Sequence, residues 1–157
     1  MERTNQRHVP VALLIVAVLL IGARIFVHAT KREPSQKTGL IRWVTPEEGL
    51  RLATATGRPM MLDFTADWCG PCHMLDEQVF RDPSIAREVN ERFIAVRVVD
   101  RKREEGRNSH VVGALQERYN VRGFPTVVFA DARNTERARM EGFRGRDEFE
   151  RLMERAR

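Results

Sequence analysis

The sequence is poor in cysteine: Cys69 and Cys72 are the only two among 157 residues. A structural zinc site needs four ligands, and these two cysteines with the adjacent His73 supply at most three on one helical turn. No second Cys-x-x-Cys pair completes the set. We therefore expect no metal site.

The sequence also lacks a cluster of basic residues interleaved with aromatic residues, although its net charge is +5. Residues 1–29 hold three arginines and one glutamate, so the remainder carries 24 basic and 21 acidic residues spread along the chain. Nucleic-acid-binding proteins concentrate their positive charge on one face. We expect a solvated charged surface and no nucleic-acid partner.

Long apolar runs are absent after residue 29, and the one that is present covers residues 9–23 without a charge. Extended past Arg24 to Ala29 it has 21 residues, close to the ~20 that span a bilayer. Arg24 is compatible with such a span, because a long arginine side chain near the end can reach the interface. One interpretation is therefore a single-span membrane anchor at residues 9–29. The other is a cleaved signal peptide, since the small residue Ala29 is typical of a cleavage site.

The orientation of this segment is not decided by charge, because Lys31 and Arg32 follow it and weaken the positive-inside argument. The short tail at residues 1–8 and the lack of a later apolar run favour a cytoplasmic tail. We expect the chain from about residue 30 onward to lie outside the cytoplasm, on the periplasmic side, either anchored or released after cleavage.

The rest of the chain fits one ordinary domain, since 42% of the residues are hydrophobic. Residues 30–39 are polar and include Pro34 and Gly39, a composition that predicts a flexible linker. A single domain at residues 40–157 should follow.

Hydrophobic periodicity and turn residues predict an α/β domain with the order αβαβαββα, a central mixed sheet flanked by helices. Residues 101–108 carry six charges in eight positions and should form an exposed loop or helix edge. The expected helices are 46–56, one from residue 70 onward that restarts at 83–92, 110–119 and 146–156; the two helical stretches between the first and second strands count as one in this order. The expected strands are 60–65, 93–99, 126–129 and 135–140.

The stretch FTADWCGPCH, residues 64–73, has two incompatible interpretations. Cys69-x-x-Cys72 is a redox dithiol at the start of a helix, whereas Cys69-x-x-Cys72-His73 matches the attachment string of c-type haem. Haem would need all three side chains to face one apolar pocket and a second axial ligand. Met74, Met140 and His110 are available in principle for that ligand.

The dithiol interpretation explains the residue types. A cysteine in the first turn of a helix is stabilised as the thiolate by unpaired backbone amides and by the helix dipole, and Cys69 stands at that position. Cys72 is about one turn further on the same face, where it can attack a mixed disulfide formed by Cys69. Pro71 lacks an amide donor that the first turn does not need. We expect Cys72 to be the more deeply placed of the two.

Four landmarks occur in an order that resembles the thioredoxin family over residues 40–157. They are Asp63 six positions before Cys69, the WCGPC motif at residues 68–72, YNVRGFPT at residues 119–126, and Gly142 before the last helix. Within the family, GRP at residues 57–59 and VFRDPS at residues 79–84 are most similar to the C-terminal thioredoxin-like domain of a periplasmic transmembrane disulfide reductase. The multi-span electron-conducting domain of that protein has no counterpart here, so the electron donor is left unidentified.

The resemblance implies roles for individual residues. Asp63 would help to deprotonate Cys72, and its place in an apolar strand should raise its pKa; an aspartate that only caps the strand end is the alternative. The segment Phe124-Pro125-Thr126 is similar to the cis-proline loop that holds a substrate peptide, with an ordinary trans proline as the alternative. Trp68 would be exposed beside the dithiol as part of the docking surface.

The resemblance also implies the activity, an extracytoplasmic thiol-disulfide oxidoreductase that uses no cofactor. Gly-Pro between the cysteines is similar to reducing thioredoxins, so reduction of protein disulfides is the expected direction. The expected partners are cysteine-bearing client proteins, an upstream electron donor and the membrane through residues 9–29. A tethered thioredoxin-fold module that only binds or holds clients, and a disulfide oxidant, stay open as alternatives. Haem is disfavoured because a thioredoxin sheet has no cavity for a porphyrin.

Overall fold

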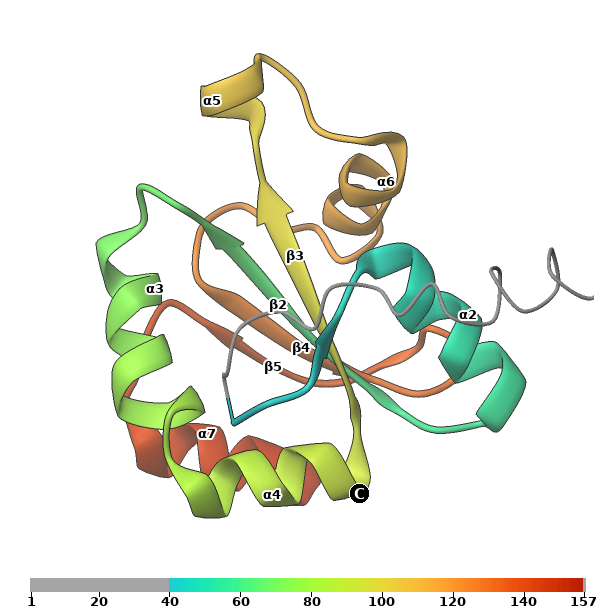
Figure 1. Cartoon of the computed structure of the whole chain (residues 1–157), viewed down its shortest axis with the longest axis vertical. Coiled ribbons are helices and arrows are strands. Elements are labelled where there is room, and N and C mark those ends of the chain that lie inside the picture. Colours follow the sequence, from blue (N-terminus) through green and yellow to red (C-terminus); the bar gives the residue numbers. More distant parts are fainter. Residues whose placement is uncertain (1–39, 157) are drawn as a thin grey trace, which may run out of the picture. The chain divides into compact units, whose positions relative to one another are not determined.

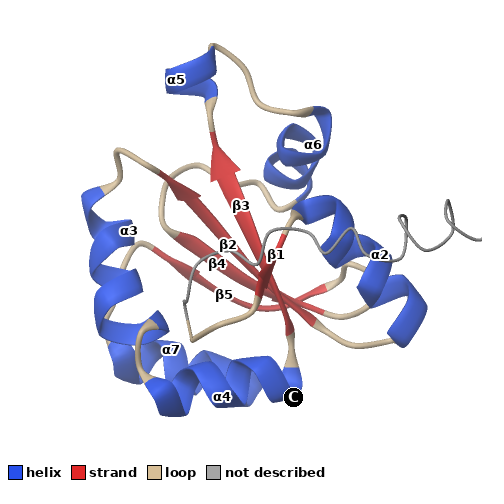
Figure 2. Ribbon diagram, viewed as in Figure 1, coloured by secondary structure: helices blue, strands red, loops and turns tan. Residues whose placement is uncertain are grey.

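A five-stranded mixed sheet lies at the centre of the computed structural model, which describes residues 40–156 (Figures 1 and 2). The strand order is β1-β3-β2-β4-β5. β1, β3 and β2 run parallel, whereas β4 is antiparallel to both β2 and β5. The strands are β1 (Trp43–Val44), β2 (Met60–Ala66), β3 (Ile94–Asp100), β4 (Thr126–Ala130) and β5 (Glu136–Glu141).

Helices cover both faces of the sheet, which gives the three-layer thioredoxin-like α/β fold expected from the sequence. One face carries α2 (Pro46–Thr56) and α6 (His110–Arg118), and the opposite face carries the remaining long helices. That second group consists of α3 (Gly70–Leu75), its continuation as a single π-helical turn η1 (Asp76–Phe80), α4 (Pro83–Arg92) and α7 (Arg146–Arg155), while the short helix α5 (Lys102–Glu105) lies beyond the end of β3.

The alternation of side chains along β2 decides which residues face the helix that follows it. Met60, Leu62 and Phe64 pack with residues of α2 and α6, whereas Met61 packs with residues of α3, η1, α4 and α7. Successive side chains of a strand point to opposite faces, so Asp63 shares the face of Met61. The carboxyl group therefore lies on the side of the sheet that α3 and η1 cover.

Helix α2 has the ends that its sequence predicts and a close contact with the sheet. The Oγ1 of Thr45 accepts a hydrogen bond from the Glu48 amide at 3.3 Å, and Gly57 ends the helix with φ 69°, in the left-handed region that glycine tolerates best. A Cβ on Gly49 would stand 2.3 Å from Cγ2 of Val96. Glycine at this position lets α2 approach β3.

One element differs from the sequence-based expectation. Strand β1 was not expected, because its two residues are too few to display a period of two; Trp43 pairs with Ala95 and Val44 with Val96. The charged stretch 101–108 agrees with the expected exposed loop or helix edge: residues 102–107 are exposed, and the stretch contains a helical turn, α5, with Gly106 after it at φ 75°. The expected tail, apolar segment and linker at residues 1–39 lie outside the described residues. Within 40–156, no helix has the length and apolar character needed to cross a bilayer.

Candidate redox site

The two cysteines form a disulfide at the start of α3. β2 ends at Ala66, and Cys69 caps the helix with its Sγ accepting a hydrogen bond from the Cys72 amide at 3.2 Å. Pro71 lies in the first turn, where no intrahelical amide bond is lost. An amide donor aimed at the Cys69 sulfur would stabilise a thiolate there.

Burial does not separate the two sulfurs in this disulfide form. Cys69 is 3% exposed and Cys72 is 4% exposed, so the expected deeper placement of Cys72 is not seen here. What distinguishes the pair is position in the helix: Cys69 is the cap, and Cys72 is within the first turn. The capping position, where an amide donates to the sulfur, makes Cys69 the candidate for the attacking residue.

Exposed apolar surface lies next to the dithiol. Trp68, directly before Cys69, is 49% exposed, and Met74 is 44% exposed. The Trp68 ring meets the Phe124 ring edge-on with centroids 6.0 Å apart. Phe124 in turn packs against Ala66, Cys69 and Cys72, so a segment far away in the sequence contacts the disulfide.

That segment is the loop before β4, and its geometry is fixed from both sides. The Phe124–Pro125 peptide bond is cis. Thr126 is buried and its Oγ1 donates to the Gly123 carbonyl at 2.8 Å, while the Gly142 amide donates to the Pro125 carbonyl at 2.8 Å. The hydroxyl of Thr126 is thus engaged within the loop itself, and the carbonyl of Pro125 is engaged with the neighbouring turn.

Asp63 is a buried carboxylic acid on the face of the sheet that α3 covers. It is 2% exposed, its Oδ2 lies 3.2 Å from Nη2 of Arg97, and its Oδ1 has no hydrogen-bond partner among the described residues. Burial raises the pKa of Asp63 to about 7, even though the Arg97 guanidinium lowers it. Burial outweighs the cation because the charged carboxylate is desolvated, so Asp63 can exchange a proton near neutral pH.

Arg97 and Asp76 belong to this site, although the sequence alone does not single them out. Arg97 pairs with Asp76 at 2.5 Å as well as with Asp63, and its guanidinium lies over the Trp43 ring at 4.1 Å. Asp76 adds a second negative charge that raises the pKa of Asp63. The available signals were an arginine inside a β-branched strand and an acid four residues after Cys72.

His73 does not share a pocket with the cysteines. It is exposed, and its Nε2 donates a hydrogen bond to the Asp67 carbonyl at 3.0 Å. Cys69 and Cys72 are buried and bonded to each other. This arrangement does not provide the common haem-facing surface that the alternative interpretation requires. Within the described part of the chain, no cluster of three or more His, Cys, Asp or Glu side chains could hold a metal ion.

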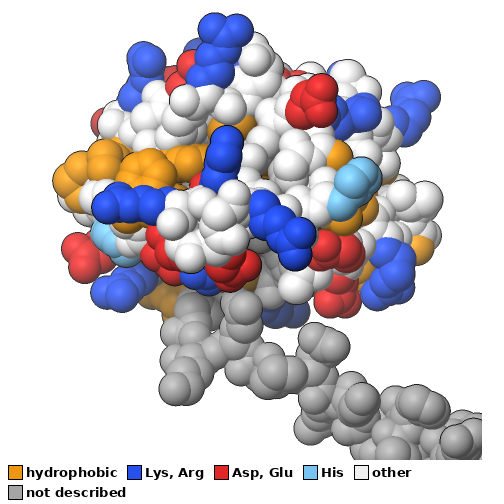
Figure 3. All heavy atoms as spheres, turned by 90° about the horizontal axis from the view of Figure 1, so that it is seen from above, with side chains coloured by type: hydrophobic (Ala, Val, Ile, Leu, Met, Phe, Trp, Pro, Cys, Tyr) orange, Lys and Arg blue, Asp and Glu red, His pale blue; other side chains and the backbone are white. Residues whose placement is uncertain are grey.

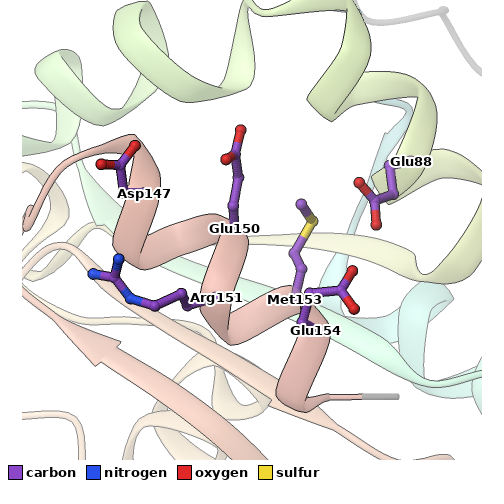
Figure 4. A pocket seen from close by; sticks show the side chains of 6 residues that line it. All are labelled: Glu88, Asp147, Glu150, Arg151, Met153 and Glu154. Atoms are coloured by element: carbon purple, nitrogen blue, oxygen red, sulfur yellow. The ribbon is translucent and has the colours of Figure 1, made fainter.

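A groove between α4 and α7 lies apart from the redox site and is lined by other side chains (Figure 4). Its polar groups are largely paired with one another or with neighbours on the same helices: Glu88 with Arg92, Glu150 with Arg146 at 2.7 Å, and Arg151 with Glu148 at 2.7 Å. None of the redox residues lines it. The lining residues are Glu88, Asp147, Glu150, Arg151, Met153 and Glu154.

Comparison with known proteins gives a family and a set of relatives. The pattern of the thioredoxin-like domain family matches residues 46–157. The thiol:disulfide interchange protein DsbD of Yersinia enterocolitica is 32% identical over 139 residues, which cover 83% of this chain and 23% of that protein. DsbD of Ralstonia nicotianae is 34% identical over 104 residues, or 66% of this chain and 16% of that protein. The chain thus spans less than a quarter of the length of these relatives.

Solved structures show the same fold. A thioredoxin from Thermus thermophilus is 32% identical with a TM-score of 0.58, covering 73% of this chain and 85% of that one. The oxidised C-terminal domain of Neisseria meningitidis DsbD is 26% identical with a TM-score of 0.52, covering 71% and 90%. The DsbH oxidoreductase, with a TM-score of 0.63 over 82% of this chain and 95% of that one, is 24% identical and supports the fold alone.

Proposed function

The chain belongs to the thioredoxin-like domain family, and from that membership we propose that it is a protein thiol-disulfide oxidoreductase that reduces client disulfides. The observation that carries the proposal is the Cys69–Cys72 disulfide at the cap of α3, with the Cys69 sulfur accepting an amide hydrogen bond. Such a cap favours the thiolate, the reactive form in disulfide exchange.

The reaction has two exchange steps. In the reduced protein, the Cys69 thiolate attacks one sulfur of a client disulfide; a bond forms between Cys69 and the client, and the other client sulfur leaves as a thiolate that takes up a proton. Cys72 then loses its proton and attacks Cys69 Sγ, which releases the second client thiol. The protein is left with the Cys69–Cys72 disulfide, and two electrons have passed to the client.

Asp63 is proposed to take the proton from Cys72. Its Oδ1 has no hydrogen-bond partner among residues 40–156, and its pKa of about 7 lets it accept and return a proton near neutral pH. Arg97 holds the other oxygen, Oδ2, at 3.2 Å and so orients the carboxyl group. In this proposal Arg97 is a positioning residue.

The client is proposed to dock on the surface formed by Trp68, Phe124 and Pro125. Trp68 is half exposed beside Cys69, and Phe124, which precedes the cis peptide bond to Pro125, packs against both cysteines. Thr126 supports this loop through its hydrogen bond to the Gly123 carbonyl. An extended segment of the client can lie along the loop while its disulfide meets Cys69.

The reducing direction, the location and the partners are part of the same proposal. The Gly-Pro pair between the cysteines is similar to reducing thioredoxins, and the DsbD relatives carry the name thiol:disulfide interchange protein. The apolar segment at residues 9–29 supports a membrane-anchored or exported domain on the periplasmic side. Each turnover consumes two electrons, so a dithiol donor must reduce the Cys69–Cys72 disulfide again.

The direct test is reduction of insulin with dithiothreitol as the electron donor. The protein should accelerate precipitation of the insulin B chain well above the dithiothreitol control, because a Cys69 thiol with a larger thiolate fraction attacks the insulin disulfide faster than dithiothreitol does. Changing Cys69 to serine should abolish the acceleration. The purified protein should also be colourless and lack a Soret band; a covalent haem band, or no acceleration with the disulfide fully reduced, would contradict the proposal.

A further inference from the structure

The charged stretch at residues 101–108 lies at the same edge of the sheet as the dithiol. β2 and β3 are parallel, and their last residues, Ala66 and Asp100, are partners in the sheet. The segment that carries Trp68 and Cys69 follows β2, and the segment that contains α5 follows β3. Figure 1 shows α5 projecting beyond the carboxyl ends of these strands.

A buried polar network fixes both ends of this segment. Asp100 is 8% exposed, and its Oδ2 accepts hydrogen bonds from Asn108 at 2.6 Å and from Gln116 of α6 at 2.8 Å. Asn108 Oδ1 accepts from the Arg101 amide at 2.7 Å, and Asp100 Oδ1 accepts from the Lys102 amide at 3.2 Å. The segment therefore has a defined place, although all but its first and last residues are exposed.

Two arginines of the segment contact the residues that precede Cys69. Arg101 forms an ion pair with Asp67. The Arg103 guanidinium lies over the Trp68 ring, 5.6 Å from its centroid, within the range of a cation–π contact. A polypeptide that approaches Cys69 across Trp68 thus meets Arg103.

The charge on Arg103 is available to such a polypeptide. Among the described residues, Arg103 has no carboxylate partner, in contrast to Arg101, and it is exposed. Figure 3, which looks at this end of the molecule, shows an orange hydrophobic patch with blue Lys and Arg side chains beside it. An arginine stacked on an aromatic ring keeps its planar edge free to bind a carboxylate.

We propose that α5 is a client-recognition element in which Arg103 pairs with a carboxylate of the client polypeptide, next to the disulfide that is reduced. This inference rests on the proposed reductase function and concerns only which clients are preferred. The clients that it favours have glutamate or aspartate close to the reactive cysteine.

The test uses two peptides that contain the same disulfide and differ only in glutamate or glutamine beside one cysteine. Their reduction by the reduced full chain is followed to obtain kcat/KM for each. The wild type should prefer the glutamate peptide by about threefold at low salt, the range of a surface ion pair, and the preference should fall at about 0.5 M salt because the charges are screened.

Arg103→Gln should bring the ratio of the two kcat/KM values to about one, and Arg103→Lys should restore part of it. The matched control is Lys102→Ala, which removes a charge from the same helix at a residue without a contact to Trp68, and which should keep the wild-type ratio. Equal rates for both peptides with the wild type, an unchanged ratio in Arg103→Gln, or an equal loss in Lys102→Ala would each overturn the inference while leaving the reductase function intact. A wild type that reduces neither peptide would overturn the reductase function and this inference with it.

Discussion

Changing Cys72 to serine should leave Cys69 covalently joined to its clients. The first exchange step needs only Cys69, whereas release needs a second thiol at Cys72. Complexes isolated from cells that express the Cys72→Ser chain should survive denaturation and disappear on reduction. Non-reducing electrophoresis followed by mass spectrometry detects them and identifies the bound proteins.

The matched control is Cys69→Ser, which keeps one cysteine but removes the helix-capping sulfur that accepts the Cys72 amide. It should trap at least about tenfold less client, because among the described residues an amide donates to the Cys69 sulfur and none donates to the Cys72 sulfur. Covalent trapping by neither variant would support a module that binds clients without exchange, and equal trapping by both would contradict the assignment of Cys69 as the attacking residue. The trapped proteins should carry cysteine and lie outside the cytoplasm; an exclusively cytoplasmic set would contradict the proposed location.

Changing Asp63 to asparagine should make the stability of the oxidised protein less dependent on pH. The pKa of Asp63 is raised from 3.8 to about 7 by burial. From about pH 4 to pH 7 the unfolded chain releases this proton while the folded chain retains it, so rising pH favours unfolding. The wild type should therefore lose stability across this window, whereas the amide in the Asp63→Asn variant does not titrate and should not contribute to any loss.

The expected size is large for a single substitution. Between about pH 5 and pH 8, the free energy of unfolding of Asp63→Asn relative to the wild type should rise by roughly 2 to 3 kcal/mol. Thermal unfolding at the two pH values should show this as a relative gain in Tm of about 10 °C.

Asp131→Asn is the control for this experiment. Hydrogen bonds from the Thr135 and Arg133 amides lower the pKa of Asp131, so the contribution of Asp131 to the free energy of unfolding changes only in the acid range. The stability of the Asp131→Asn variant should therefore change with pH in parallel with that of the wild type from about pH 5 to pH 8. A pH profile of Asp63→Asn that also runs parallel to the wild type would show that Asp63 does not titrate in this window.

The main elements of the fold could be predicted from the sequence because each carries a local signal. Thr45 before Pro46 marks the start of α2, and the mostly apolar stretch at residues 60–65 is typical of a strand buried on both faces. Strand β1 could not be predicted, since its two residues gain their pairing only from β3. Long helices and strands can be predicted from their hydrophobic periodicity, whereas short strands that are held only by tertiary contacts cannot.

The same distinction holds for the site. Cys69 and Cys72 form a motif by their spacing, and Asp63 is visible as an acid in an apolar strand. Arg97 and Asp76 are 21 residues apart and come together only because η1 packs over β3, so their pairing has no signature in the sequence. The position of Arg103 over Trp68 is likewise a product of the sheet, whose parallel strands bring residues 68 and 103 to one edge.

The reduction potential of the Cys69–Cys72 pair tests the central claim most directly. The protein is equilibrated in redox buffers of known potential, quenched with an alkylating agent, and the fraction of modified cysteine is measured. A reductase should show one two-electron transition close to the value of thioredoxin, about −270 mV. A midpoint close to that of the oxidant DsbA, about −120 mV, or cysteines that never titrate together, would contradict the account.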